Sequence, residues 1–447
     1  MNFISQLPLF ISLFCFCLLS ASKIALAESE LGNLTNIKNR DIETNFLWIK
    51  LHEFQFSHPK SQILVSSDPV SSIIYAAARG LEEISIISFK KTSQEEFILN
   101  KNKVVKIPKT DPNLENTFIL DIKFSEKKLY STVFRYSDKD KSCSFVELLE
   151  SDKELSYFKR IFKSSPCLAN PSDLINISGR IAVDKSNIYV AGGNMLMDIG
   201  NTSFPRSSYE FCCPENNYLN TMKKTNFFGS VILINKKTHA YKKISNGHRS
   251  PGGLFYDEYR KVLWESEHGP RGGDEINKIN LHKVQDYGYP FVSLGSPYRK
   301  DSANLGTKFN SHEKFTSPFF AFLPSIGPSQ FALPPKNEPF NNLWGSDLLL
   351  TSLKDRSIFR IKIFDDRAIY LEKMYIGNRL RSIDTLKENI IMGTDNGSVL
   401  VLESNKTEPV GTYPTNDYDF PSCAFNGKDK SCVPKKKHNW ISSLFTS

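Results

Sequence analysis

The 447-residue chain lacks the short motifs that mark several common enzyme classes. It has no Gly-x-Gly-x-x-Gly after a strand-like segment, no P-loop, no Cys-x-x-Cys pair and no Gly-x-Ser-x-Gly elbow. Long stretches with the 3.6-residue apolar period of an amphipathic helix are nearly absent as well. These absences disfavour α/β folds and the nucleotide-binding, thiol-redox and hydrolase chemistry that such motifs carry.

The chain also lacks a concentrated basic segment of the kind that binds nucleic acid. Its formal net charge of +9 is spread along the sequence, and it falls to +8 if Lys23 is removed with an N-terminal signal. The one cluster, at residues 435–438 (KKKH), lies in a polar segment near the C-terminus and is typical of a solvated tail. We therefore predict no nucleic-acid partner.

Only one long apolar run is present, at residues 7–21, and it is followed by Ala25-Leu26-Ala27. This pattern predicts a signal peptide at residues 1–27, cleaved before Glu28. Residues 1–6 contain no Lys or Arg, so an uncleaved membrane anchor is the alternative. No second run approaches the roughly 20 apolar residues that span a bilayer. After cleavage we expect a soluble, periplasmic or secreted protein without a stable membrane span.

Cysteine is scarce, and removal of the signal leaves six residues of this type: Cys143, Cys167, Cys212, Cys213, Cys423 and Cys432. An even number suits an oxidising compartment. Cys143 with Cys167 and Cys423 with Cys432 are the simplest local closures, whereas the adjacent Cys212 and Cys213 need a strained vicinal bridge or distant partners. The pairing stays open. We assign residues 405–447 to a polar C-terminal tail that includes the Cys423–Cys432 pair.

Internal repetition is the main signal for the fold. A short apolar strand, a polar turn and a second alternating strand recur at residues 120–133, 179–191, 253–267 and 381–394. Less regular copies occur at residues 63–76 and 330–353. Sheet units repeated at this spacing are typical of a β-propeller, because one blade buries its two faces only between neighbours. The six copies predict an all-β, six-bladed propeller over residues 28–404, with two tandem β-sandwiches as the alternative.

Residues 247–290 are the most unusual stretch, with seven glycines, three prolines and seven acidic residues around one apolar strand. Crowding of these residue types at strand ends predicts backbone shaped around a ligand or metal. The segments GHRSPGGL (247–254), EHGPRGGDEIN (267–277) and DYGYP (286–290) resemble the soluble, pyrroloquinoline-quinone (PQQ)-dependent glucose/aldose dehydrogenase family, also called glucose/sorbosone dehydrogenases. The resemblance continues, in order, at residues 323–329, 344–357 and 377–383, and residues 178–184 fit a further family strand.

The resemblance implies a six-bladed propeller that oxidises a sugar or alcohol hydroxyl by hydride transfer to PQQ and passes electrons to an acceptor. PQQ carries three carboxylates, so its site needs fixed cations. The residues that match the family's PQQ site are Arg249, Ser250, Lys354, Arg379 and Arg381. The family's calcium ion, held partly by backbone carbonyls, corresponds to Gly269 and Pro270.

A second, structural calcium position in the family matches Glu275 and Tyr287, with Asp274 as a helper. The alternative for these carboxylates is that they fix a tight loop. The chain is expected to be a monomer or a homodimer.

The sequence departs from the family at the reacting face. The family's histidine base precedes a Gly-Lys strand, whereas Thr225 stands near that position here, and no histidine occurs between His58 and His239. Ser250 replaces the asparagine that usually follows Arg249. Loss of a positioned base costs roughly 10²- to 10⁴-fold in rate. His248 and His268 are candidate bases, although histidines in structural loops more often serve as hydrogen-bonded scaffold.

Two functions follow from these matches and departures. The first is an exported PQQ- and calcium-dependent sugar dehydrogenase with an unknown or altered catalytic base. The second is a non-catalytic propeller that keeps the anion or cofactor pocket and acts as a binding or interaction module. Retention of the four cationic positions favours the first, and loss of the histidine favours the second.

Overall fold

The computed structural model describes residues 31–404, except for 45–46, 111–113, 115, 137–142, 166–167, 170–175, 195–225, 290, 297–307 and 310–311. The predicted signal peptide at 1–27 and the tail at 405–447, with Cys423 and Cys432, lie outside these residues. So do Thr225, Cys167, Cys212 and Cys213. In the part of the chain that is described, no helix has the length and apolar character needed to cross a membrane.

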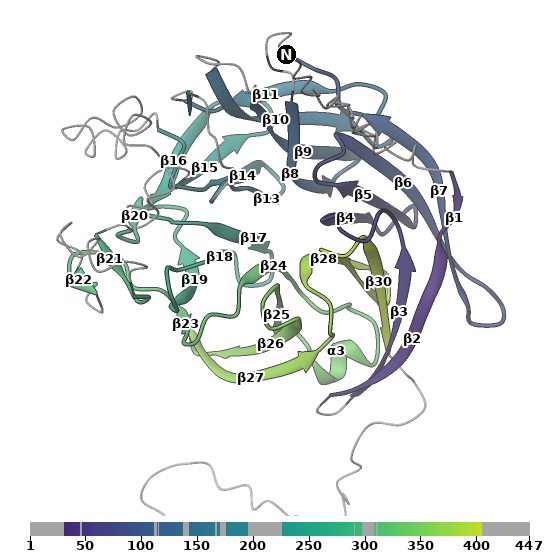
Figure 1. The fold of residues 1–447 in the computed structure, drawn as a ribbon. Coiled ribbons are helices and arrows are strands. Elements are labelled where there is room, and N and C mark those ends of the chain that lie inside the picture. Colours follow the sequence, from purple (N-terminus) through teal and green to yellow (C-terminus); the bar gives the residue numbers. More distant parts are fainter. Residues whose placement is uncertain are drawn as a thin grey trace, which may run out of the picture.

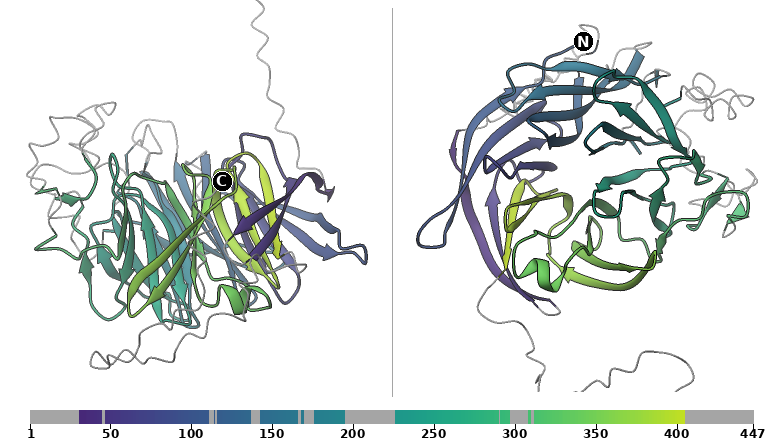
Figure 2. Two further views of the ribbon diagram at one scale, coloured as in Figure 1. Left: turned by 90° about the horizontal axis from the view of Figure 1, so that it is seen from below. Right: turned by 180° about the vertical axis from the view of Figure 1, so that it is seen from behind.

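Six small antiparallel sheets stand around a common axis and form a six-bladed β-propeller, which confirms the predicted fold class (Figure 1). The innermost strand of each blade contacts the innermost strands of its two neighbours, so the contacts close a ring. Figure 2 shows the same ring from the side and from behind. The axis is thus lined by the first strand of every blade.

Blades 1 to 3 come from the first part of the chain. From the axis outward, blade 1 contains β4 (Ile63–Asp68), β5 (Ile73–Ala78), β6 (Glu83–Lys91), β7 (Phe97–Lys106) and β1 (Gly32–Asn33). Blade 2 contains β8 (Asn116–Ser125), β9 (Lys128–Tyr136), β10 (Cys143–Asp152) and β11 (Lys159–Lys163), and β12 (Leu168–Ala169) pairs with β10. Blade 3 contains β13 (Gly179–Val183), β14 (Asn187–Gly192), β15 (Ser230–Asn235), β16 (Tyr241–Asn246) and β20 (Gln285–Asp286).

Blades 4 to 6 complete the ring. Blade 4 contains β17 (Pro251–Asp257), β18 (Val262–Glu267), β19 (Asp274–Ile279) and β23 (Phe320–Phe322). Blade 5 contains β24 (Pro328–Ala332), β25 (Leu348–Ser352), β26 (Ser357–Phe364) and β27 (Arg367–Tyr375), with the short helix α3 (Phe340–Leu343) before β25. Blade 6 contains β28 (Leu380–Leu386), β29 (Asn389–Thr394), β30 (Ser398–Ser404), β3 (Leu47–Gln55) and β2 (Thr35–Thr44). A separate two-stranded parallel sheet joins β21 (Val292–Ser293) and β22 (Lys308–Phe309).

Alternation along each strand explains why the blades must stack. In β14, Val190 belongs to an apolar cluster shared with blade 2, whereas its neighbour Tyr189 belongs to a cluster shared with blade 4. Both side chains are buried. Because successive side chains point to opposite faces, one apolar strand supplies two interfaces. Each fully buried aliphatic side chain stabilises the fold by about 1.5–3 kcal/mol, which a blade standing alone would lose.

The two ends of the described chain meet in blade 6. β3 pairs antiparallel with β30, from Ile49 opposite Ser404 to Gln55 opposite Ser398. The repeat pattern predicted the inner strand pairs of all six blades, but it did not predict that β2 and β3 complete the last one. Blade 6 therefore combines strands from the early and the late sequence, and this pairing closes the ring.

Glu403 supports this closure, and we expect it to make part of the stability depend on pH. Its carboxylate pairs with His52 of β3 at 2.8 Å and with Lys91 of blade 1 at 2.8 Å. Burial alone would raise the pKa of Glu403, but hydrogen bonds with His52 and Lys91 lower it below the ordinary value of 4.5. The stability that the ionised carboxylate contributes is therefore present above the unfolded-state pKa of about 4.3 and is lost as pH falls through the lowered folded value.

Glu403→Gln should lower the free energy of unfolding at neutral pH by about 0.5–1 kcal/mol, as expected for a partly solvated pair. Denaturant unfolding at neutral and acid pH measures this. The difference between wild type and variant should shrink once the pH is well below 4.5. An equal difference at both pH values would show that the charge of Glu403 does not support closure.

Candidate functional site

Loops of blades 4, 5 and 6 meet at one end of the ring. In each blade, the start of the innermost strand pairs with the end of the next strand: Pro251 with Glu267, Pro328 with Ser352, and Leu380 with Thr394. Hydrogen bonds connect these ends from blade to blade. His268 lies 2.7 Å from the carbonyl oxygen of Pro328, and the Ser329 hydroxyl donates to the carbonyl of Arg381 at 2.5 Å. The predicted residues Arg249, Ser250, Gly269, Pro270, Lys354 and Arg379 lie on these connected loops, and Arg381 is the second residue of β28. Glu275 lies in β19, and Tyr287 follows β20 of blade 3.

Arg249 lies two residues before β17 and is buried. Its Nη1 donates to the carbonyl oxygens of His268 at 2.9 Å and Gly269 at 3.2 Å, and its guanidinium lies 5.9 Å from the centre of the Tyr289 ring. The backbone amide of Arg249 donates to Glu267 Oε2 at 2.6 Å. Arg249 is therefore held rigidly against the loop between β18 and β19.

Arg379 and Arg381 of blade 6 share one carboxylate, that of Asp395. Arg381 binds it with two hydrogen bonds, Nε to Oδ1 at 2.8 Å and Nη2 to Oδ2 at 2.7 Å, and Arg379 Nε reaches Oδ2 at 3.2 Å. Burial would raise the pKa of Asp395, but the hydrogen bonds and charges of Arg381 and Arg379 lower it. Arg379 keeps 49% of its side chain exposed, against 12% for Arg381, so Arg379 is open to a ligand.

Lys354 lies just after β25 in blade 5, and its side chain is exposed. Arg379 Nη1 lies 3.4 Å from the carbonyl oxygen of Leu353, the residue before Lys354. Burial lowers the pKa of His268, and the charges of both Arg381 and Arg249 act on the same imidazole. The structure thus brings the four predicted cations onto adjoining loops of three consecutive blades. Ser250 contributes its carbonyl, which accepts the amide of His268 at 3.0 Å.

A buried arginine holds the backbone on which the site is built. Arg180 of β13 donates from Nη2 to the carbonyl of Arg381 at 3.2 Å and to the Ser329 hydroxyl at 3.3 Å, and Nη1 pairs with Asp121 of blade 2 at 3.4 Å. These contacts connect blades 2, 3, 5 and 6 near the axis. Arg180 and Asp121 position Arg381 without being open to a ligand themselves, since both are buried.

The glycines of the GHRSPGGL segment serve packing between blades. A Cβ on Gly252 would lie 2.2 Å from the carbonyl oxygen of Pro328, and one on Gly253 would lie 2.1 Å from that of Ser329. Gly272 and Gly273 have φ values of +82° and +65°, which glycine adopts without strain. The prediction that the stretch 247–290 is shaped around a ligand or metal did not separate its glycines, and those at 252 and 253 make room for the backbone of blade 5.

Gly253→Ala should therefore destabilise the fold, because the new methyl group meets backbone atoms of Ser329 and Gln330 that cannot move alone. Overpacking of this kind costs about 1–3 kcal/mol or more. Gly80→Ala is the matched control, since its Cβ would meet nothing within 4 Å. Denaturant unfolding should place the Gly80 variant at or slightly above wild type, and equal stability of the two variants would contradict the packing argument.

The carboxylate of Asp274 organises the loop beside Arg249. Its Oδ1 accepts the amide of Gly269 at 3.1 Å, and its Oδ2 accepts the amides of Ile326 at 2.8 Å and Gly327 at 2.7 Å. Three backbone donors satisfy this carboxylate, which agrees with the loop-fixing alternative for Asp274. The same bonds hold the β18–β19 loop of blade 4 to the loop before β24.

Glu275 of blade 4 and Tyr287, which follows β20 of blade 3, are buried. Glu265 and Glu267 of β18, and His248 of the loop between β16 and β17, are buried as well. The Tyr287 hydroxyl donates to the carbonyl of Lys278 at 2.8 Å, and its ring lies 4.9 Å from that of His248. His248 is fully buried and contacts Ser245 through Nε2 at 2.7 Å. Burial lowers the pKa of His248 to about 3. Neither feature suits a base that must reach a substrate, so we assign His248 no part in proton transfer.

Sequence reasoning missed several residues of this end of the ring. Asp395, which binds two of the predicted arginines, carried no motif signal. Glu265 and Glu267 were also missed, although two acids at positions i and i+2 of an otherwise apolar strand place both on one buried face. That pattern was the available signal.

Comparison with known proteins places the chain in a family. The family model described as glucose/sorbosone dehydrogenase matches residues 118–403. An uncharacterized protein from Synechocystis is 31% identical over 164 residues, which is 36% of this chain and 38% of that protein. Aldose sugar dehydrogenase YliI from Escherichia coli is 29% identical over 153 residues, 32% of this chain and 37% of the enzyme. The matched segments thus span well under half of these curated relatives.

The solved structures agree in fold. The soluble aldose sugar dehydrogenase from Escherichia coli, in its apo form, superposes with a TM-score of 0.58 at 17% identity, covering 79% of this chain and 99% of that one. A crystal structure of glucose dehydrogenase gives the same TM-score at 16% identity, covering 78% and 98%. The family match covers more than half of the sequence and contains the loops of blades 4, 5 and 6. The chain therefore belongs to the glucose/sorbosone dehydrogenase family.

Proposed function

We propose that this protein is a sugar dehydrogenase that oxidises a sugar or alcohol hydroxyl with PQQ as its electron acceptor. The observation that supports it most is the gathering of Arg249, Lys354 and the Arg379–Arg381 pair on adjoining loops of three blades. We further propose an exported protein, periplasmic or secreted, that passes electrons to an external acceptor.

The charges at this end of the ring fit a tricarboxylate. Four cationic side chains lie on this end of the ring, and two of them, Arg379 and Arg381, share the carboxylate of Asp395. Arg379 and Lys354 are exposed, so they can turn toward a ligand, whereas Arg249 and Arg381 are fixed by protein contacts. When bound there, the quinone would supply the hydride acceptor. Arg–carboxylate hydrogen bonds would set its orientation.

Calcium is part of this proposal, with the carbonyls of Gly269 and Pro270 as ligands. The Gly269 carbonyl already accepts one hydrogen bond from Arg249, which leaves one lone pair for a cation. A metal ion there would stand beside a guanidinium. We therefore expect calcium to bind at this position together with an anionic ligand and only weakly without it. Glu275 and Tyr287 remain the proposed ligands of a second, structural calcium ion.

Proton transfer decides between this dehydrogenase and a second candidate function. Thr225, at the family's histidine position, lies outside the described residues. His268 is half-buried and engaged with the Pro328 carbonyl, and Asp395 has a lowered pKa, which makes it a weak base. A propeller that binds the quinone without turnover is favoured by this lack of a suitable base among the described site residues, and it would serve as a binding module.

A measurement of substrate turnover distinguishes the dehydrogenase from the binding module. The purified chain, loaded with PQQ and calcium, should reduce a redox dye in the presence of aldoses or simple alcohols and not in their absence. The rate should fall to background when PQQ or calcium is withheld. Bound quinone with no substrate-dependent dye reduction across such a panel would contradict the dehydrogenase and support the binding module.

A further inference from the structure

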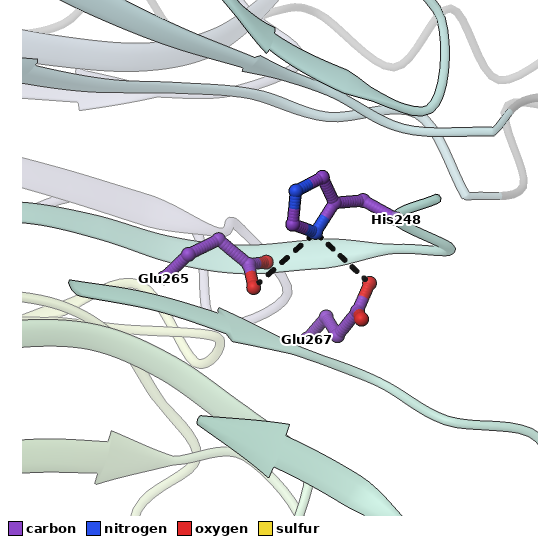
Figure 3. A group of neighbouring side chains, drawn as sticks. All are labelled: His248, Glu265 and Glu267. Atoms are coloured by element: carbon purple, nitrogen blue, oxygen red, sulfur yellow. Dashed lines mark ion pairs between the residues drawn. The ribbon is translucent and has the colours of Figure 1, made fainter. Parts of the chain in front are cut away.

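A buried group joins one imidazole, from the loop between β16 and β17, with two carboxylates of β18, and their ligand atoms face one another (Figure 3). His248 Nδ1 lies 3.6 Å from Glu265 Oε2 and 3.9 Å from Glu267 Oε2. The exposed fractions are 0% for His248, 0% for Glu265 and 3% for Glu267. We propose that these three residues form a binding site for a divalent transition-metal ion, with Zn²⁺ as the representative probe.

The distances suit a shared metal ion better than direct hydrogen bonds. Hydrogen bonds between nitrogen and oxygen are about 2.7–3.2 Å long, and both separations from Nδ1 exceed that range. Ligand atoms held at about 2.0–2.2 Å around a tetrahedral zinc ion lie roughly 3.3–3.6 Å from one another. The separation of His248 Nδ1 from Glu265 Oε2 falls in this range at 3.6 Å, and that from Glu267 Oε2 lies slightly above it at 3.9 Å. His248 Nδ1 and Glu265 Oε1 are buried and have no hydrogen-bond partner among the described residues. Figure 3 shows the imidazole directed between the two carboxylates.

Surrounding groups orient these ligands in the way that metal sites require. The Ser245 hydroxyl lies 2.7 Å from His248 Nε2, so Nε2 can carry the ring proton and leave the Nδ1 lone pair directed at the carboxylates. Asn277 Nδ2 donates to Glu265 Oε2 at 3.0 Å and to Glu267 Oε1 at 3.2 Å. The amide of Arg249 donates to Glu267 Oε2 at 2.6 Å.

Charge balance also calls for a cation. Glu265 and Glu267 are buried together on β18, and Arg249 is the cation that acts on Glu267. Buried carboxylates need either a positive partner or a proton. Protonation is the competing explanation, because burial and mutual repulsion raise the pKa of both Glu265 and Glu275. Protonation does not explain why the His248 imidazole points at the two carboxylates. A metal ion accounts for the imidazole and the two carboxylates together.

The donor set selects the class of metal. Calcium prefers six to eight oxygen ligands, while an imidazole nitrogen with two carboxylates suits zinc and similar transition metals. This site is therefore chemically distinct from the calcium positions proposed above. It would stabilise residues 248 and 267, which immediately precede Arg249 and His268 of the cofactor loops.

The test measures zinc bound to the purified full-length chain after chelation, gel filtration and re-addition of Zn²⁺ in saturating calcium. Wild type should retain one equivalent by elemental analysis, and X-ray absorption should detect one imidazole among nitrogen and oxygen ligands. Glu265→Gln and His248→Gln should each weaken zinc binding by roughly 100-fold or more, beyond the 10- to 100-fold typical of residues that only orient ligands. His282→Gln, which removes an exposed imidazole, should bind as wild type does.

Wild-type measurements keep the proposal testable if a variant fails to fold. Zn²⁺ should raise the unfolding temperature of the chelated wild-type protein, and Ca²⁺ should not reproduce the full shift. Absence of a retained equivalent in wild type, unchanged binding in Glu265→Gln, or an absorption spectrum without an imidazole ligand would each overturn the site. Any of these results would favour protonated carboxylates in its place.

Discussion

Arg249→Ala is expected to lower the affinity for PQQ about 100- to 1,000-fold. Hydrogen bonds to charged groups contribute about 1.5–3 kcal/mol each, and a guanidinium can form two with one carboxylate. At the lower end of that range, losing both removes about 3–4 kcal/mol, at about 1.4 kcal/mol for each tenfold change. Titration of the purified variant with PQQ in the presence of calcium, followed by the quinone absorbance, measures the change.

Arg249 also donates to the carbonyls of His268 and Gly269, so its removal could act through the loop. Arg260→Ala is the matched control, because Arg260 belongs to the same blade, in the turn between β17 and β18, and donates to the Ser346 carbonyl at 2.7 Å. It should lose stability but keep its affinity for the quinone. Arg249→Lys, which keeps charge without the forked donors, should fall between alanine and wild type. If all three variants bound the quinone with the same affinity, Arg249 would not be part of the cofactor site.

Arg381→Met is expected to destabilise the fold by about 3 kcal/mol. Its side chain and that of Asp395 are 12% and 10% exposed, and removal of one partner from a buried ion pair costs about 3–5 kcal/mol. Arg379 still contacts Asp395 at 3.2 Å, which places the expected value at the lower end. Denaturant unfolding measures the loss.

A second substitution tests the cause of that loss. In Arg381→Met combined with Asp395→Leu, no buried carboxylate is left without its bidentate partner. Most of the lost stability should return, while affinity for PQQ should stay low because the cation is still missing. A double variant no more stable than the single one would show that Arg381 acts through its packing and not through its charge.

The inner strands could be predicted from the sequence because their signal is local. Period-2 alternation in segments such as 179–191 follows directly from burial of both blade faces, and it identified the first strand pair of all six blades. Completion of blade 6 by β2 and β3 depends on contacts between sequence ends some 350 residues apart, for example Ile49 with Ser404. No local pattern encodes such a pairing.

The same distinction between local and long-range signals applies to the site residues. Arg249, Arg379 and Arg381 carry a family motif and could be named in advance. Asp395 could not, because its meeting with both blade-6 arginines depends on the geometry of the loop after β29. The stretch 247–290 as a whole was predicted to be shaped around a ligand or metal, and within it the structure packs Gly252 and Gly253 against Pro328 and Ser329. Ligand approach and blade packing require the same small residue, so the sequence alone did not separate them.

Equilibrium titration of the purified chain with PQQ, in the presence of calcium, tests the central claim most directly. If the arginines and lysine of blades 4, 5 and 6 form a tricarboxylate site, one equivalent of quinone should bind per chain, with a shifted absorbance that Arg249→Ala weakens and Arg260→Ala does not. No saturable binding by the wild-type protein would contradict the proposed cofactor site, and with it the proposed dehydrogenase.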